Sequence, residues 1–259
     1  MEYFVYHFQV FLLIMMRMSS MMIIAPFFSS GVIPFRIKAL FAFLVTLVIF
    51  PVVARNGYSL TGNMGLYALL VLKEVGIGIY IGFLVSVIVA AFQLSGEFFA
   101  VQIGFGINEV FDPLAQVSIP LVGQLKNLIG MLVFLAIGGH HFLVRAVYKS
   151  FELAPLLSLG KGTTGPLMKH VAYVFSGMFV VALKISIPVV ATIFLVSVSM
   201  GVLSKAAPQM NIMMLGFPLK IMVAFGVMLA IAPLVVRVMS VSLDRTFRFI
   251  YKVLVYWPA

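Results

Sequence analysis

Residues Val75 to Gly96 read VGIGIYIGFLVSVIVAAFQLSG, a run of 22 residues without a charged side chain. A helix needs about 20 apolar residues to cross the hydrocarbon core of a bilayer. In lipid the backbone hydrogen bonds must be satisfied within the segment, which favours a helix. The apolar character continues back past Lys73 and Glu74 to Gly65. The stretch therefore predicts a transmembrane helix and decides the class of fold.

The composition of the whole chain agrees with a membrane protein. Of 259 residues, 17 are Lys or Arg and 7 are Asp or Glu, so 9% are charged, whereas soluble domains have about 25%. Hydrophobic residues make up 63% of the chain, and the mean hydropathy is +1.20. These values exclude a soluble globular enzyme, a disordered chain and a coiled coil. A β-barrel would need strands that alternate apolar and polar residues, but the apolar runs here are continuous.

Such runs recur and predict an all-α, polytopic membrane protein that forms a single domain. Hydropathy gives about six long apolar helices, at residues 8–30, 37–54, 66–95, 124–146, 171–204 and 212–236. We expect kinks and broken helices, because the run 171–204 is longer than one span needs and contains Lys184 and Pro188. The segment 98–123 is apolar but is interrupted by Gly104, Gly106, Pro113 and Pro120. Broken segments are tolerated at membrane depth only where they are buried in protein or line a cavity.

Basic residues concentrate in two places and give an orientation. The loop 145–170 has four Lys or Arg residues and one acid, and so does the C-terminal tail from Arg237 onwards. With six spans this loop and both termini share one face, which the positive-inside rule makes cytoplasmic. One span more or fewer would reverse the N-terminus. The net charge of +10 fits membrane topology, anionic lipids or acidic partners better than nucleic acid. The first apolar stretch continues past Arg17 to Phe28, so we expect it to stay attached rather than to be a cleaved signal.

A stripe of small residues marks one face of the predicted helix 66–95. Gly78, Gly82, Ser86 and Ala90 recur every four residues and so lie on one side of a helix. Small side chains let helices approach closely inside a membrane. The stripe therefore predicts close packing, either against another helix of this chain or against a neighbouring subunit.

The stretch Gly96 to Pro113 combines three acids with bulky apolar side chains. Its glycines permit unusual backbone angles, and its final Asp112-Pro113 favours a turn. Carboxylates within a membrane segment, such as Glu97, are a functional hypothesis by default, and Glu97 is a candidate for a charge contact with another subunit. One interpretation is a flexible apolar loop that obstructs a pore, and the other is an ordinary interfacial loop with solvated acids.

Isolated basic residues are a second unusual feature. Lys184, Lys205, Lys220 and Arg237 occur in a part of the chain that has no acid between Glu152 and Asp244. A lysine at the centre of a bilayer costs about 2.5–3.5 kcal/mol. These side chains could snorkel to the interface, lie outside the hydrocarbon, or meet acids of partner subunits. We predict that Lys184, Lys205 or Lys220 meets an acid of another chain.

The sequence contains no pattern that favours an enzyme or a cofactor. His140 and His141 are adjacent, so on a helix they point about 100° apart, and zinc needs three or four convergent ligands. There is no HExxH, GxSxG or Walker A sequence. The absence of cysteine removes thiolate chemistry and sulfur-ligated metals. We therefore predict that the protein is not an enzyme and binds no cofactor.

Several short motifs are specific through their order and spacing taken together. They are Ala25-Pro26, Pro34-Phe35-Arg36-Ile37-Lys38, Gly96-Glu97, Val101-Gln102-Ile103-Gly104, Phe111-Asp112-Pro113, Gly139-His140, Ala207-Pro208-Gln209-Met210-Asn211-Ile212 and Gly216-Phe217-Pro218. With these motifs the chain resembles the FliR family of type III secretion export apparatus proteins. The resemblance extends over nearly the whole chain, and the familiar pattern often has Met where Ile103 stands.

This resemblance implies a function that composition could not supply. It implies a subunit of the flagellar export gate in the bacterial inner membrane, within the basal body. There it would form with FliP and FliQ the channel for unfolded flagellar proteins, and would contact FlhB and FlhA. Residues 1–170 would be FliP-like and residues 171–259 a FliQ-like helical hairpin. The helices would join a conical assembly raised largely above the membrane plane, with the C-terminus in the cytoplasm.

The resemblance also implies a pore plug at about Gly104 to Ala115. The residues that match it are Gly104, Phe105, Gly106, Ile107, Val110 and Phe111. An apolar constriction can block ions at rest by excluding water. The alternatives are an injectisome homologue of the same family, a self-contained transporter of small solutes, or an intramembrane enzyme using Glu97, Asp112 and His140. A transporter would need a midplane site and often an inverted repeat, and neither is evident.

Overall fold

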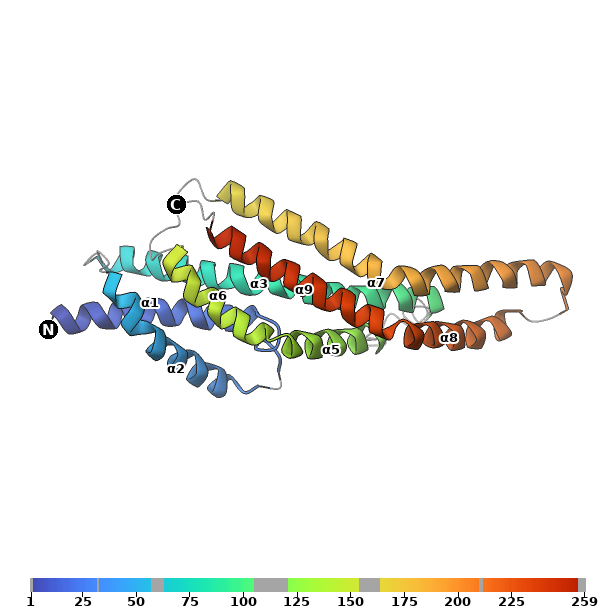
Figure 1. Cartoon of the computed structure of the whole chain (residues 1–259), viewed down its shortest axis with the longest axis horizontal. Coiled ribbons are helices and arrows are strands. Elements are labelled where there is room, and N and C mark those ends of the chain that lie inside the picture. The colour runs from blue at the N-terminus through green and yellow to red at the C-terminus, as the bar shows by residue number, and fades with distance from the viewer. Residues whose placement is uncertain are drawn as a thin grey trace. The chain divides into compact units, whose positions relative to one another are not determined.

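The computed structural model of the chain is helical wherever it describes the backbone. It describes residues 2–31, 33–56, 63–104, 121–153, 164–209 and 212–255, and no strand occurs among them (Figure 1). The elements are α1 (Glu2–Ile24), α2 (Phe35–Val53), a 3-10 turn η1 (Ala54–Asn56), α3 (Met64–Ile103), α5 (Leu121–Ala136), α6 (Gly139–Leu153), α7 (Thr164–Ala206), α8 (Ile212–Ala230) and α9 (Ala232–Val255). The predicted all-α, polytopic membrane fold is confirmed.

Among the described residues, four helices are long and apolar enough to cross a membrane. They cover Tyr3–Ile24, Phe35–Val53, Met64–Ile103 and Leu167–Ala206. Two bent pairs, α5 with α6 and α8 with α9, raise the number to six if each pair is one span. The predicted number of about six is therefore the upper value.

Two of the predicted spans, 124–146 and 212–236, each contain a bend, which agrees with the expected kinks and broken helices. α5 and α6 meet at 63°, and α8 and α9 meet at 60°. Gly138, at the first bend, has φ 73°, a conformation that glycine adopts without strain. Pro233, in the first turn of α9, has no N–H to donate and its ring crowds the preceding turn.

One predicted helix boundary needs correction. The predicted span ended at residue 95, whereas α3 continues without interruption to Ile103 and has 40 residues. The interruption begins at Gly104, which has φ 94° and whose N–H donates to the carbonyls of Ala100 and Val101. Glycine with positive φ is a common way to end a helix.

The chain forms two compact units. Unit 1 comprises Met1–Val87, Phe134–Phe175 and Leu243–Ala259, and unit 2 comprises Ile88–Val133 and Ser176–Ser242. α3, α5, α7 and α9 therefore each begin in one unit and end in the other. The resemblance predicts a boundary near residue 170. The two units are defined by contacts within the chain, and they leave that boundary a prediction.

α1 presents a long buried face in unit 1. Its fully buried apolar side chains recur at helical spacing, and Figure 1 shows α2 returning beside it in the opposite direction. On α3 the side chains of Ile77, Ile81 and Leu84 are buried in the same unit. The buried face of α1 consists of Val10, Leu13, Ile14, Met18 and Met21.

In unit 2 the core joins the end of α3 to α5, α7 and α8. Phe99 lies edge-on to Phe225, with ring centroids 6.0 Å apart. Large parts of α7 are not covered by the chain itself, since only 28% of its most apolar window is buried, against 61% for α3. The buried core cluster is Phe99, Ile103, Val122, Val189, Ile193 and Ala224.

Candidate functional site

The predicted plug lies almost wholly outside the described residues. Phe105, Gly106, Ile107, Val110 and Phe111 fall in the segment 105–120, and only Gly104 of the predicted set is described. The plug assignment stays a prediction. The structure does define the two helix ends that this segment connects, Ile103 of α3 and Leu121 of α5.

These two helices are in direct backbone contact close to the segment. A Cβ added to Gly96 would lie 2.5 Å from the Cα of Gly123 and 2.8 Å from the carbonyl oxygen of Val122. Real Cβ atoms do not approach so closely, so α3 and α5 require glycine at position 96. The segment 105–120 is therefore attached to two helices that are held tightly together.

A buried lysine lies next to this glycine contact. Lys126 of α5 is 2% exposed, its ammonium donates to the carbonyl of Ser95 at 3.3 Å, and it lies 5.5 Å from the ring centroid of Phe99. Glu97, half-buried, accepts a hydrogen bond from the amide of Gln93 at 3.2 Å. Among the described residues, Glu97 makes no ion pair, so its predicted contact with another subunit is untested. The sequence analysis had missed Lys126.

The first three residues of the small-residue stripe pack inside the chain. Cβ atoms on Gly78 and Gly82 would lie within 3 Å of the backbone oxygens of Arg17 and Met21 in α1. The Ser86 hydroxyl donates to the carbonyl of Ile24, the last residue of the same helix, at 2.6 Å. These contacts correspond to the intramolecular interpretation of the stripe. The fourth residue, Ala90, is exposed.

The strongest polar cluster of unit 1 is one that the sequence analysis did not identify. Arg17 of α1 and Glu74 of α3 form an ion pair with 2.6 Å between Nη2 and Oε2, and their side chains are 0% and 2% exposed. Arg17 also donates through Nε to Glu74 and through Nη1 to the hydroxyl of Ser150 in α6. Its guanidinium carbon lies 4.1 Å from the centroid of the Phe151 ring. One buried cation thus connects three helices.

A signal for this pair was present in the sequence. Arg17 and Glu74 are opposite charges inside two predicted spans, 8–30 and 66–95, and charges at such positions usually pair. They are 57 positions apart in the sequence, and this separation gave no direct indication of contact. Their low exposure excludes water, so the pair is held in an apolar environment.

The isolated lysines occupy different environments. Lys184 and Lys205 of α7 are exposed, whereas Lys220 of α8 is half-buried and lines a pocket. No acid in the described part of the chain lies within ion-pair distance of these three ammonium groups, since the ion pairs there are Arg17–Glu74 and Lys149–Glu152. Contact with an acid of another chain stays a prediction.

The histidines do not form a metal centre with described residues. The His140 and His141 rings are 4.1 Å apart, and His140 lies beside Phe27 with a centroid distance of 6.4 Å. The described residues contain no group of three or more His, Asp or Glu side chains that could hold a metal ion. Asp112, which the enzyme alternative requires, lies outside the described residues.

Comparisons with known proteins all point to one family of bacterial export proteins. The model of the family described as "Bacterial export proteins, family 1" matches residues 8–246. The chain is 32% identical over 219 residues to the flagellar biosynthetic protein FliR of Bacillus subtilis (strain 168), with 84% of each chain covered. It is 25% identical to FliR of Escherichia coli (strain K12), covering 85% of this chain and 83% of the relative. It is 26% identical to FliR of Borreliella burgdorferi over 92% of this chain and 89% of the relative.

Proposed function

This chain belongs to family 1 of the bacterial export proteins and is a membrane component of the flagellar export apparatus, and from that premise we propose a more specific role. It is a subunit of the flagellar type III export gate. With FliP- and FliQ-like subunits it forms the channel through which unfolded flagellar proteins leave the cytoplasm. FlhB and FlhA are further partners. The chain works as a structural part of a conduit rather than as an enzyme.

The observation that carries this proposal is the length and apolar exposure of α7. At about 1.5 Å per residue, its 43 residues extend about 65 Å, whereas the hydrocarbon core is about 30 Å thick. A tilt of about 40°, the upper end of the usual range, still leaves a projected length of about 50 Å. Large exposed apolar side chains nevertheless occur from Met168 to Leu203. The apolar surface beyond the lipid needs protein to cover it, as a multi-subunit gate provides.

The extent of burial distinguishes α7 from α3, which is nearly as long. α3 has 40 residues, but most of its apolar window is covered by its own chain. Most of the apolar window of α7 is left uncovered by its own chain. This supports an assembly in which the helices stand largely above the membrane plane and pack against sister subunits.

The segment Gly104 to Ala115 is the plug of the closed channel in this proposal. A conduit wide enough for an unfolded chain must block ions at rest, and an apolar constriction does so by excluding water. The close contact of α3 and α5 at Gly96 and Gly123 supports this role, because it anchors both ends of the segment.

The proposed location is the inner membrane at the flagellar basal body, with the C-terminus in the cytoplasm. The basic residues of the C-terminal tail and the positive-inside rule support this orientation. The relatives reported above are all named flagellar biosynthetic proteins, which favours the flagellar system over an injectisome. A C-terminal reporter that is active only in the cytoplasm tests the orientation.

Affinity purification of the intact tagged chain from flagellated cells tests the function. We expect FliP- and FliQ-like proteins to co-purify and imaging of the complex to show this chain within a shared conduit. An unrelated polytopic membrane protein with the same tag is the control. A solitary monomer that moves a small solute would overturn the proposal.

A further inference from the structure

α7 and α8 of unit 2 do not close completely against each other, and the space between them is a pocket of about 320 Å³. Figure 1 shows α8 lying beside the C-terminal part of α7. The pocket exists because small residues face it from both helices: a Cβ on Gly201 would meet nothing within 4 Å, and one on Gly216 would meet only the end of Met200 at 3.6 Å. Its lining is Ser197, Met200, Gly201 and Ser204 of α7 and Gly216, Phe217 and Lys220 of α8.

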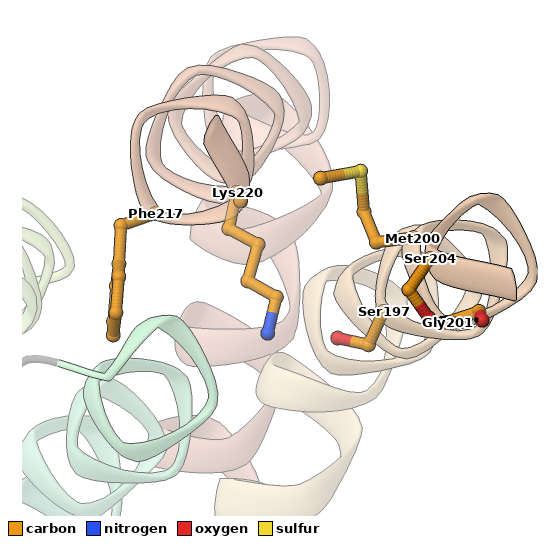
Figure 2. A pocket seen from close by; sticks show the side chains of 7 residues that line it. Ser197, Met200, Gly201, Ser204, Phe217 and Lys220 are labelled. Atoms are coloured by element: carbon orange, nitrogen blue, oxygen red, sulfur yellow. Dashed lines mark hydrogen bonds between the residues drawn. The ribbon is translucent and has the colours of Figure 1, made fainter. Parts of the chain in front are cut away.

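One cation projects into this pocket. In Figure 2 the ammonium end of Lys220 and the hydroxyl of Ser197 point toward each other across the space, while Phe217 and Met200 bound it with apolar surface. No described residue forms an ion pair or hydrogen bond with the Lys220 ammonium, which has three N–H groups to donate. An anion in the pocket would compensate this half-buried ammonium.

The charge of unit 2 shows why the anion is absent from its described part. The one acid described there, Glu97, bonds to Gln93 on its own helix, so the unit carries a cationic excess. Complementary charge must therefore come from elsewhere. The described cations of the unit are Lys126, Lys184, Lys205, Lys220 and Arg237.

The lining of the pocket distinguishes a carboxylate from a phosphate. Phosphate sites gather several donors, commonly backbone N–H groups at a helix N-terminus together with cations. Here the backbone N–H groups belong to helix interiors, and the two serine hydroxyls donate to their own helix, Ser197 to Ile193 at 2.9 Å and Ser204 to Gly201 at 2.7 Å. A single ammonium is matched by a single negative charge.

The apolar surface of α7 and α8 near the pocket indicates which kind of molecule would supply the negative charge. Large apolar side chains stand exposed on both sides of it, on α7 at Val198, Val202 and Leu203 and on α8 at Leu215 and Leu219. An apolar helix that lay over these flanks would cover them and could insert one side chain into the pocket. Met200 and Phe217 would contact the methylene groups of that side chain.

We propose that the α7–α8 pocket binds the carboxylate of an Asp or Glu side chain on an apolar helix of a neighbouring gate subunit, with Lys220 as its ion-pair partner. This inference rests on the proposed function, because it requires an assembly of several subunits. It selects one of the three isolated lysines. Lys184 and Lys205 are exposed on α7 and do not line this pocket.

Zero-length crosslinking with a carbodiimide tests the contact in the purified native complex. The reagent joins a lysine amine to a carboxylate in direct contact and leaves an amide that mass spectrometry locates. We expect an amide between Lys220 and an Asp or Glu of another chain. The Lys220→Gln variant, which keeps most of the side-chain length, should lose that crosslink and weaken assembly at least about 30-fold, the effect of removing one partner of a buried charge pair. The matched control Lys205→Gln should assemble as the wild type does.

The other outcomes each contradict a defined part of the reasoning. If the complex forms but Lys220 crosslinks to Glu109 or Asp112 of its own chain, or to nothing, the inference is wrong and the proposed function stands. Retention of an anionic phospholipid that depends on Lys220, detected by native mass spectrometry, also overturns it. Assembly of the Lys220→Gln variant at the wild-type level would also overturn the inference. If the chain purifies without any partner, both the inference and the proposed function fail.

Discussion

Replacing either member of the buried pair Arg17–Glu74 should destabilise unit 1 strongly, and replacing both should not. Three features determine the size of the effect: the 2.6 Å ion pair, the near-zero exposure of both side chains, and the additional bond from Arg17 to Ser150. Removing one partner of a buried pair leaves a charge without compensation and costs about 3–5 kcal/mol. That is a large part of the total stability of about 5–15 kcal/mol for a typical protein.

The two single substitutions should differ in size. Arg17→Met removes the opposite charge beside Glu74, and a carboxylate can become neutral by taking up a proton. Glu74→Leu removes the opposite charge beside Arg17, and a guanidinium cannot lose its charge in a protein. We therefore expect Glu74→Leu to be the more damaging variant. In the double variant no charge remains, and Ser150 still donates to the carbonyl of Val147 at 2.6 Å, so stability should return to within about 1–2 kcal/mol of the wild type.

The assay is a double-mutant cycle on the full-length chain in its membrane complex. The amount of folded protein in the membrane and its thermal unfolding are measured for the wild type, both single variants and the double variant. The coupling free energy should be at least about 2 kcal/mol. Single variants with wild-type stability would refute the reasoning, and so would a double variant less stable than either single one.

Three further predictions concern close packing, the plug and the second buried cation. Gly78→Ala should cost at least about 1–3 kcal/mol in thermal unfolding, because its Cβ would meet the backbone oxygen of Arg17, while the matched control Gly76→Ala has nothing within 4 Å and should not destabilise; equal effects would contradict the packing. Deleting residues 105–111 should leave assembly intact but make the membrane leak ions, and unchanged conductance would exclude the plug. Lys126→Met should stabilise the protein by about 1 kcal/mol or more, because the buried ammonium has one carbonyl at 3.3 Å; lower thermal stability would contradict this.

Local features of the sequence predicted most of the helices. The uncharged run Val75 to Gly96 was enough to identify α3, since a helix is the one element that satisfies its own backbone in lipid. The bends at Gly138 and Pro233 also have local causes, but hydropathy averages over a whole segment and does not locate them. Hydropathy likewise ended α3 too early, because Glu97 and the glycines beyond it resemble a loop.

Contacts between distant segments could not be predicted in the same way. The pairing of Arg17 with Glu74 depends on how α1 packs against α3, and the burial of Lys126 depends on the contact of Gly96 with Gly123. Lys184, Lys205 and Lys220 look alike in the sequence, and only the position of α8 beside α7 separates the third from the others. The plug could be named only from the family resemblance, because nothing in the spacing of its residues defines a pore.

The interleaving of the two units has a consequence for biosynthesis. The last segment of unit 1, Leu243–Ala259, is synthesised after all the other segments of the two units, and its Phe247 stacks on Phe142 with ring centroids 4.0 Å apart. Unit 1 is therefore incomplete until this segment has been synthesised. A premature stop before Leu243 would remove this segment from unit 1. The product would be an incompletely folded protein that quality-control proteases degrade, rather than a shortened but functional one.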